Sequence, residues 1–375
     1  MKSSLGIYLH IPFCVKKCGY CDFCSFPDKS GEYMSAYVRE LCRRIEAESA
    51  AAKGYEVDTV YFGGGTPSLL DAGELEKIID SLKRSFDIAP DAEITFECNP
   101  ATADRKYFED IRKLGVNRLS IGLQSAVDAE LSLLGRAHDC KDFVKCFSDS
   151  RAAGFDNVSA DLMYGIPDQT LDSFEYSLDF LISLSPEHIS AYGLTLEEGT
   201  RFWRQRETLC LADDDAQAQM YCLCSKKLAD AGYEKYEISN FSKKGRRSRH
   251  NLRYWQGREY LGFGVAAYSY FGGRRYGNSR DIGAFIRGED ILAEDEALSD
   301  NDIREEYVML GLRLAEGIDT SEYSARFGRD FFEDYAAVEK WINQGFMGRH
   351  GSRIYFTDKG FLVSNSILSE MLSFD

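Results

Sequence analysis

The first 200 residues alternate short apolar runs with longer amphipathic stretches, and this alternation constrains the fold more than any other feature of the sequence. The short runs are typical of buried strands, and the longer stretches repeat with the period of a helix. Strands that alternate with helices predict βαβ units and a parallel sheet. Because six such units follow one another without a reversal, we expect an α/β fold that forms an open or partial barrel. The expected strands are 6–11, 57–62, 93–97, 118–123, 157–163 and 188–194, and the expected helices are 33–52, 72–86, 105–114, 141–153 and 171–184.

The pattern changes after about residue 200. A helical stretch at 213–231 and a strand at 233–240 precede a basic stretch at 243–249. Three short helical patterns then fill 302–345, and 345–357 resembles a hairpin that leads into a last helix. This order predicts a C-terminal α+β module similar to a winged helix. Acidic residues outnumber basic ones in it, so a packing or lid role is favoured over DNA binding.

A chain of 375 residues is long enough for two or three domains at roughly 150 residues each. We expect a barrel over residues 1–200, a connecting α/β region over 201–298 and the winged-helix-like domain over 299–375. The net charge of −16 argues against binding to nucleic acid, which requires a basic surface. The sequence shows neither an export signal nor the roughly 20 consecutive apolar residues of a membrane span. We therefore expect a cytoplasmic protein whose 11 cysteines are reduced.

Three cysteines stand close together directly after the first strand, in a Cys-x3-Cys-x2-Cys spacing formed by Cys14, Cys18 and Cys21. Thiolates are soft ligands that suit iron–sulfur clusters or zinc. A structural zinc site uses four ligands, whereas a cubane held by three thiolates leaves one iron open. Cys24 is a possible fourth ligand, so a four-cysteine zinc site is the alternative. The other seven cysteines are scattered over helices and strands and are interpreted as core or surface residues.

The cysteine spacing, with Tyr20 directly before the last cysteine, resembles the signature of the radical S-adenosylmethionine (SAM) superfamily. The resemblance implies a TIM-like radical SAM barrel of (β/α)6 form and a [4Fe–4S] cluster on Cys14, Cys18 and Cys21. It also implies that the amine and carboxylate of SAM chelate the open iron, and that electron transfer cleaves SAM to a 5′-deoxyadenosyl radical. The Gly-Gly-Gly-Thr-Pro run at 63–67 closes the second strand and is similar to the motif that contacts the SAM amino group.

Polar side chains also follow the later strands. Glu97 ends the third strand, Gln124 ends the fourth and Asp161 lies in the fifth. Because ligands in such folds bind at the carboxyl ends of the strands, we expect these groups to converge on the barrel mouth. Arg136 would add a fork of donors for a carboxylate.

These motifs are together similar to the oxygen-independent coproporphyrinogen III oxidase-like family, over nearly the whole chain. The resemblance includes the runs at 10–13, 118–122, 192–194 and 198–200. It implies that SAM contacts, some of them to a second SAM where family members bind one, come from Tyr8, Tyr20, Gly64, Gly65, Thr66, Glu97, Gln124, Arg136 and Asp161. It also implies an electron donor such as flavodoxin or ferredoxin.

The family contains oxidases, which decarboxylate a porphyrinogen, and HemW-like heme chaperones, which deliver heme to acceptor proteins. The oxidases carry an N-terminal extension and a further cysteine two positions after the third ligand, where this sequence has Phe23. Both differences favour the chaperone branch, with the oxidase as the alternative and RNA modification as a more distant one. That branch has a His-Asn-x-x-Tyr-Trp motif, present at 250–255, which predicts His250 as an axial heme ligand. Flanking arginines could pair with heme propionates, and acceptors could include a transient membrane-protein contact.

Overall fold

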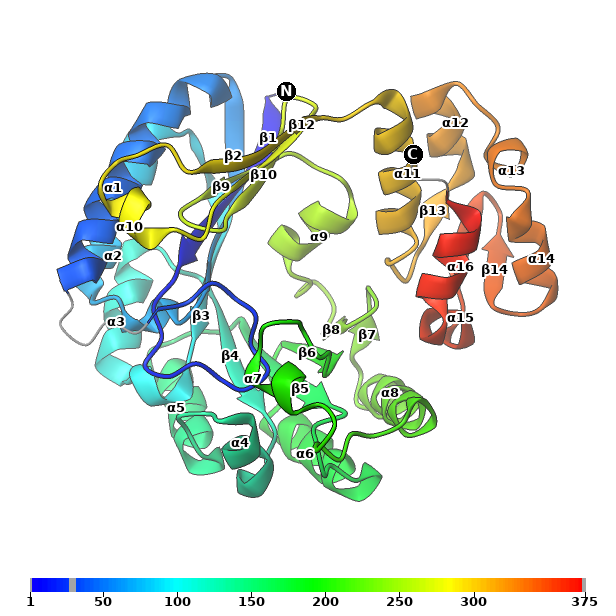
Figure 1. Cartoon of the computed structure of the whole chain (residues 1–375), viewed down its shortest axis with the longest axis horizontal. Helices are drawn as coiled ribbons and strands as arrows, with labels where there is room; N and C mark the ends of the chain where they lie inside the picture. Colours follow the sequence, from blue (N-terminus) through cyan, green and yellow to red (C-terminus); the bar gives the residue numbers. More distant parts are fainter. Residues whose placement is uncertain (1, 27–31, 373–375) are drawn as a thin grey trace.

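A partial barrel of six parallel strands forms the centre of the molecule (Figure 1). The computed structural model describes residues 2–26 and 32–372. The strands lie side by side in chain order, so the expected partial (β/α)6 barrel is confirmed. They are β1 (Ser3–Ile11), β2 (Tyr55–Gly64), β3 (Ile88–Cys98), β4 (Arg118–Gln124), β5 (Val158–Tyr164) and β6 (His188–Gly193).

Helices cover the outer face of this barrel (Figure 1). They are α1 (Glu32–Glu48), α2 (Ala72–Ser85), α3 (Arg105–Leu114), α4 (Asp128–Leu134), α5 (Cys140–Ala152) and α6 (Leu171–Leu184). Several begin at a polar side chain that accepts a backbone N–H of the first turn, as Asp71, Asp104 and Thr170 do. The apolar faces of these helices pack on the sheet and form one continuous core. Among the described residues, no helix is both long and apolar enough to span a membrane.

Further strands extend both edges of the barrel. On one edge β9 (Tyr260–Phe263) pairs in parallel with β1, and β10 (Tyr268–Phe271), β11 (Arg274–Asn278) and β12 (Leu292–Ala297) follow. On the other edge the prediction of a single strand at 233–240 is wrong. The chain instead forms two short antiparallel strands, β7 (Glu234–Lys235) and β8 (Asn240–Ser242). The reversal between them occurs where the buried Glu237 carboxylate accepts the backbone N–H of Ser239, at 3.1 Å.

The basic stretch at 243–249 leads directly into a short helix, α9 (Arg249–Trp255), at the amino-terminal ends of the barrel strands. Ser248 caps this helix through its hydroxyl, which accepts the N–H of Asn251 at 3.3 Å. The carboxylate of Glu93 on β3 accepts the N–H groups of Arg249 and His250, each at 3.1 Å. The cap at Ser248 and the sequence-distant Glu93 on β3 therefore fix α9 against the amino-terminal ends of the strands.

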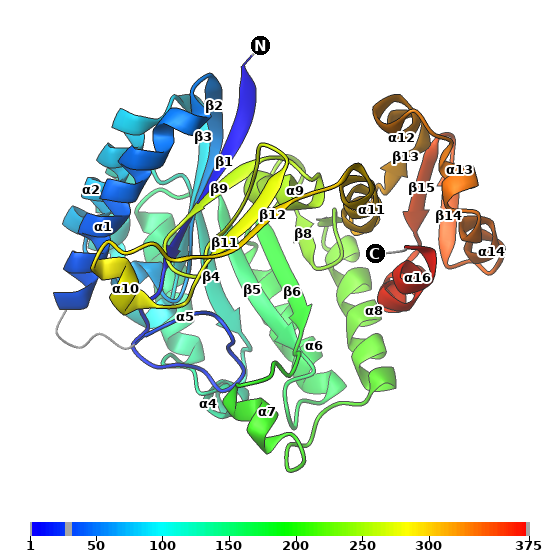
Figure 2. The same ribbon diagram turned by 45° about the horizontal axis from the view of Figure 1, so that its top comes forward.

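The C-terminal part is a separate lobe beside the barrel (Figure 2). Its sheet has the order β13-β15-β14, with strands Ile318–Asp319, Arg353–Phe356 and Met347–His350. Its helices are α11 (Asp300–Gly311), α12 (Thr320–Phe327), α13 (Phe331–Asp334), α14 (Ala337–Asn343), α15 (Asp358–Leu362) and α16 (Ser364–Met371). The α+β arrangement and the hairpin expected at 345–357 are both present. Its core also includes Tyr221 from α8 (Asp214–Asp230), which joins the lobe to the barrel.

Candidate cofactor-binding site

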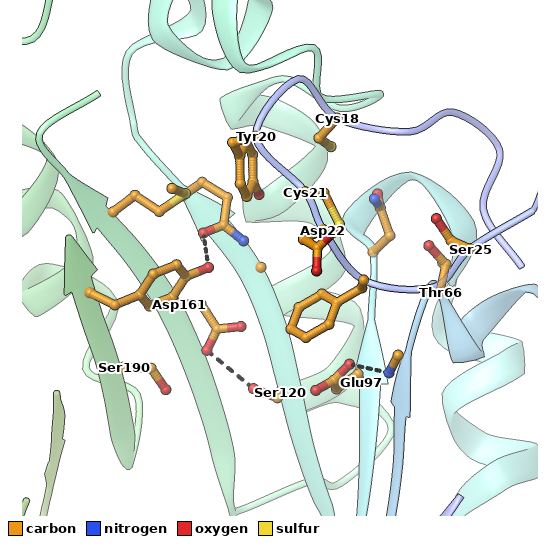
Figure 3. Close-up of a pocket in the computed structure, with 18 of the residues that line it drawn as sticks. Cys18, Tyr20, Cys21, Asp22, Ser25, Thr66, Glu97, Ser120, Asp161 and Ser190 are labelled. Carbon is orange, nitrogen blue, oxygen red and sulfur yellow. Dashed lines mark hydrogen bonds between the residues drawn. The ribbon is translucent and has the colours of Figure 1, made fainter. Parts of the chain in front are cut away.

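A cavity of about 650 Å³ opens at the carboxyl ends of the barrel strands (Figure 3). Its wall is formed by the loop after β1 and by side chains from the inner faces of β2 to β6. Most of the residues expected at the site line this cavity, namely Cys14, Cys18, Tyr20, Cys21, Gly64, Gly65, Thr66, Glu97, Gln124, Arg136 and Asp161. Residues far apart in the sequence thus meet at one place, as the strand-end rule predicts.

The three cysteines of the loop are half-buried free thiols on the cavity wall. Cys14 Sγ lies 3.4 Å from Thr66 Oγ1, and Arg136 Nη1 donates to Cys18 Sγ at 3.8 Å. The pKa of the Cys21 thiol is raised to about 11, mainly by burial; a backbone hydrogen bond at Phe23 opposes the shift, and the neighbouring Cys18 and Cys14 contribute to it. The three thiols are therefore electrostatic neighbours within one pocket.

Backbone hydrogen bonds hold this loop in place. The N–H of Cys14 donates to Phe26 O at 3.1 Å, and that of Gly19 donates to Leu134 O at the end of α4, at 2.9 Å. The carbonyl of Gly19 in turn accepts the N–H of Phe202 in α7 (Arg201–Gln205), at 2.9 Å. Contacts from two separate helices thus position the cysteines.

Cys24 does not share the cavity. Its side chain is 5% exposed and packs in the barrel core, and its backbone carbonyl is 2.8 Å from His10 Nε2. Over the residues that the structure describes, no three His, Cys, Asp or Glu side chains are placed to hold a single metal ion. Cys24 therefore does not stand with Cys14, Cys18 and Cys21 on the cavity wall, where a four-cysteine zinc site would need it. Three thiols spread around one pocket fit a cubane, whose ligands are separated by the width of the cluster.

Glu97 accepts hydrogen bonds from two sides of the cavity wall. Tyr61 Oη donates to Oε1 at 2.7 Å, and the N–H of Gly64 donates to Oε2 at 3.3 Å, as Figure 3 shows for the latter. Burial raises the pKa of this carboxyl to about 7; the hydrogen bond from Tyr61 opposes the shift and the nearby Asp161 adds to it. Glu97 can therefore change its ionisation near neutral pH.

Gly64, the last residue of β2, and Gly65 directly after it allow close packing of the backbone against β1 and the cysteine loop. Gly64 has a φ of +111°, and a Cβ there would lie 2.6 Å from the His10 ring. A Cβ on Gly65 would lie 2.6 Å from the carbonyl oxygen of Phe13. Side chains at Gly64 and Gly65 would therefore clash with β1 and with the start of the cysteine loop.

Gln124 and Asp161 complete the opposite wall. Gln124 has a φ of +69°, a conformation rare outside glycine that is often found at functional sites, and its Oε1 accepts from Tyr192 Oη at 2.9 Å. Ser120 Oγ donates to Asp161 Oδ1 at 3.2 Å (Figure 3). Burial raises the pKa of Asp161, although hydrogen bonds from Ser190 and Ser120 oppose the shift.

Several cavity residues were not expected from the sequence. They are Tyr61, Arg118, Ser120, Met163, Ser190 and Asn251. Three of the six share a signal, because they stand two, four or six positions from an expected residue on the same strand and so face the same side. Arg118 and Ser120, for example, lie six and four positions before Gln124.

Two expected site residues lie outside the cavity wall. The ring of Tyr8 stacks on Tyr61 with centroids 6.2 Å apart, and its hydroxyl is 3.0 Å from His10 Nδ1. His250 on α9 is fully buried, and its Nδ1 and Nε2 each lie 2.9 Å from a hydroxyl, of Thr59 and Tyr254. Burial lowers the pKa of His250 to about 3, so the ring is neutral. Both ring nitrogens thus have hydrogen-bond partners in this structure, and heme ligation by His250, expected from the His-Asn-x-x-Tyr-Trp motif, stays a prediction.

The arginines near His250 are also paired within the protein. Arg253 is buried and forms an ion pair with Asp58. Arg246 lies 3.3 Å from Asp156, and Arg247 lies within 4 Å of Glu234 and Glu316. In this arrangement their positive charge is largely offset by the acidic surface.

The comparisons with known proteins agree with this geometry. The radical SAM superfamily pattern matches residues 8–181, and the HemN C-terminal domain pattern matches 298–363. The crystal structure of coproporphyrinogen III oxidase (HemN) from Escherichia coli superposes with a TM-score of 0.86 at 23% identity, over 99% of this chain and 90% of that one. At that identity the likeness defines the fold. The chain is thus a radical SAM protein with a HemN-like fold.

Sequence relatives define the branch. The chain is 35% identical to heme chaperone HemW of Bacillus subtilis, over 99% of both chains. It is 35% identical to HemW of Escherichia coli over 98% of both, and 36% identical to HemW of Mycobacterium tuberculosis over 98% of this chain and 94% of that one. The chain therefore belongs to the HemW family.

Proposed function

We propose that the chain binds a [4Fe–4S] cluster on Cys14, Cys18 and Cys21. The observation that carries this proposal is that the three half-buried thiols of one loop line a cavity in a member of the HemW family, whereas Cys98, which also lines it, is a buried residue at the end of β3. Cys24 is packed in the core, so one iron is left for a ligand outside the protein.

SAM is the ligand that we assign to the open iron. When bound, the cluster and SAM together supply a route to a 5′-deoxyadenosyl radical. The cavity wall offers carboxylates (Glu97 and Asp161), an amide (Gln124) and a guanidinium (Arg136), which can orient the charged and hydroxyl groups of SAM. Tyr20, Gly64, Gly65 and Thr66 belong to the same wall, and Tyr8 would act through its contact with Tyr61.

We further propose that the chain binds heme and delivers it to acceptor proteins in the cytoplasm, in keeping with its relatives, which are named heme chaperones. The loop beside the cavity supports this, because Val15 and Phe23 are 63% and 66% exposed next to the exposed Lys16 and Lys17. An apolar surface with adjacent cations suits an amphiphilic dianion. An electron donor such as flavodoxin or ferredoxin, and a transient membrane-protein acceptor, are the partners we assign.

Heme ligation by His250 stays a prediction with a structural condition. The ring can reach iron only if its hydrogen bonds to Thr59 and Tyr254 break and α9 moves from the barrel. In the domain division that we propose, residues 1–200 carry the cluster, 201–298 carry α9 and 299–375 form the C-terminal domain.

The alternative is oxygen-independent coproporphyrinogen III oxidase, which shares the fold. Phe23 argues against it, because the position that holds a further cysteine in the oxidases is here an exposed phenyl ring on the cavity wall. The test is to incubate reconstituted protein with coproporphyrinogen III, SAM and reductant, and to titrate heme in parallel. Stoichiometric heme uptake without porphyrinogen turnover is expected, whereas turnover would support the oxidase.

A further inference from the structure

Arg118 is a buried cation for which the mechanism above has no use. It is the first residue of β4, is 1% exposed and lines the cavity. Its Nε is buried without a hydrogen-bond partner. Within residues 2–26 and 32–372, its guanidinium forms neither a side-chain hydrogen bond nor an ion pair within 4 Å. By contrast Arg253, which is equally buried, is paired with Asp58.

The groups around Arg118 are polar and belong to the end of the cavity that is remote from the cysteines. We call this end the cavity floor, formed by Arg118, Ser190, Asn240 and Asn251. Asn240 Oδ1 is also buried without a partner. The carboxylates of Glu97 and Asp161 face the same space and interact with Arg118 electrostatically, yet neither approaches to ion-pair distance. The cavity floor thus presents a hydrogen-bond donor, Arg118 Nε, and an acceptor, Asn240 Oδ1, that have no partner.

A guanidinium removed from water is unfavourable unless an anion with good geometry accompanies it. The planar fork of arginine matches a carboxylate with two parallel hydrogen bonds. We propose that Arg118 binds a carboxylate group of a ligand that occupies the cavity floor. This inference rests on the proposed placement of SAM at the cluster, because the carboxylate of that SAM is engaged at the iron. Arg118 and Gln124 are six strand residues apart, a rise of about 20 Å, so the carboxylate at Arg118 belongs to a second ligand.

Two ligands offer this chemistry: a tetrapyrrole through a propionate, and a further SAM molecule through its amino-acid end. Each has an analogue that lacks the carboxylate charge, namely heme dimethyl ester and decarboxylated SAM. The test measures the affinities of cluster-reconstituted protein for heme, SAM and both analogues, and counts the SAM molecules bound per chain.

For one of the two pairs, which for SAM means the molecule that binds in addition to the one at the cluster, we expect the carboxylate ligand to bind about tenfold or more tightly than its analogue, the gain expected from a charge-assisted hydrogen bond. Arg118→Met should abolish that preference and Arg118→Lys should retain part of it. Arg44→Met is the matched control, since it removes a largely buried arginine that pairs with Glu40 outside the cavity and should leave the preference intact. Circular dichroism and cluster absorbance report whether each variant folds, and Arg118→Gln replaces Arg118→Met if the latter does not.

The outcomes separate this inference from the proposed function. A preference that persists in Arg118→Met, or wild-type protein with no preference in either pair, overturns the role of Arg118. If wild-type protein takes up heme but Arg118 affects neither pair, the inference fails and the proposed function stands. If heme does not bind while SAM shows an Arg118-dependent preference, the inference stands and heme binding fails.

Discussion

Glu97 is the carboxylate of the cavity whose charge is most sensitive to pH near neutrality. Its pKa is raised to about 7, first by burial, so the ionised form is gained as the pH rises through 7. If the carboxylate accepts hydrogen bonds from SAM, the affinity for SAM should rise about tenfold between pH 6 and pH 8, because the ionised fraction rises by that factor. Isothermal titration calorimetry of the reconstituted protein at several pH values measures this.

Glu97→Gln is the control for that pH dependence. Glutamine keeps the shape and the acceptor for Tyr61 but does not titrate in this range. The variant should bind SAM more weakly and with a flat profile between pH 6 and pH 8. A wild-type profile that is flat, or a glutamine variant with the same slope as wild type, would show that another group titrates.

The cysteines give the second prediction at this scale. Anaerobic reconstitution should give about four irons per chain, and Cys14→Ala, Cys18→Ala or Cys21→Ala should each abolish cluster absorbance. Cys24→Ala should retain the iron, because its thiol packs in the core and lies 3.9 Å from the carbonyl of Arg280. Iron analysis and visible absorption measure both outcomes. Equal loss of iron in Cys24→Ala would mean that the loop rearranges to use four ligands.

Most chemistry-bearing residues of the cavity could be predicted from the sequence, because a strand's carboxyl end is recognisable and strand ends converge. What the sequence does not provide is the direction and partner of each side chain. Gly64 is needed for contact with His10, which is 54 residues away. His250 belongs to the His-Asn-x-x-Tyr-Trp motif, which predicts heme ligation, yet both of its ring nitrogens are hydrogen-bonded, to Thr59 and to Tyr254. Both facts depend on pairs brought together by the whole fold.

At the scale of elements, α9 closes the amino-terminal end of the barrel, and His250 is its central polar contact. His250→Ala should lower the free energy of unfolding by about 1–3 kcal/mol, because the hydroxyls of Thr59 and Tyr254 lose a buried partner. Urea denaturation measures the change, and His350→Ala, at an exposed position of β14, should change it little. Unchanged stability together with a shifted Soret band and weaker heme binding would instead identify His250 as the axial ligand.

The elements themselves follow the sequence where the hydrophobic pattern is long. The helices expected at 105–114 and 171–184 coincide with α3 and α6. The seven-residue α4 was not expected, because two turns are too short to establish a period. The stretch 233–240 reads as one strand because it contains the strand-favouring residues Tyr233, Tyr236 and Ile238. The chain reverses at Glu237, whose buried carboxylate accepts the backbone N–H of Ser239 in the turn.

At the scale of the whole molecule, the C-terminal domain docks on the barrel through a small set of contacts around Lys235. This side chain lies on β7 and its ammonium is 2.6 Å from Asp358. It also lies over two aromatic rings, 5.0 Å from that of Tyr221 on α8 and 4.3 Å from that of Phe361 on α15. A backbone hydrogen bond from Ala315 to Tyr236 O, at 3.0 Å, runs beside it. One cation therefore contacts both the connecting region, through Tyr221, and the C-terminal domain, through Asp358 and Phe361.

Lys235→Ala should loosen this docking by about 1–2 kcal/mol, since it removes two cation–π contacts and a half-buried ion pair. Hydrogen–deuterium exchange should increase in α11, α15 and α16, while β1 to β6 keep their protection, because the barrel has its own core. Asp358→Ala is the matched control: its carboxylate is 71% exposed, so its loss should cost under about 1 kcal/mol and leave the rings covered. Faster exchange throughout the barrel would contradict the prediction, because it would mean that barrel and C-terminal domain unfold as one unit.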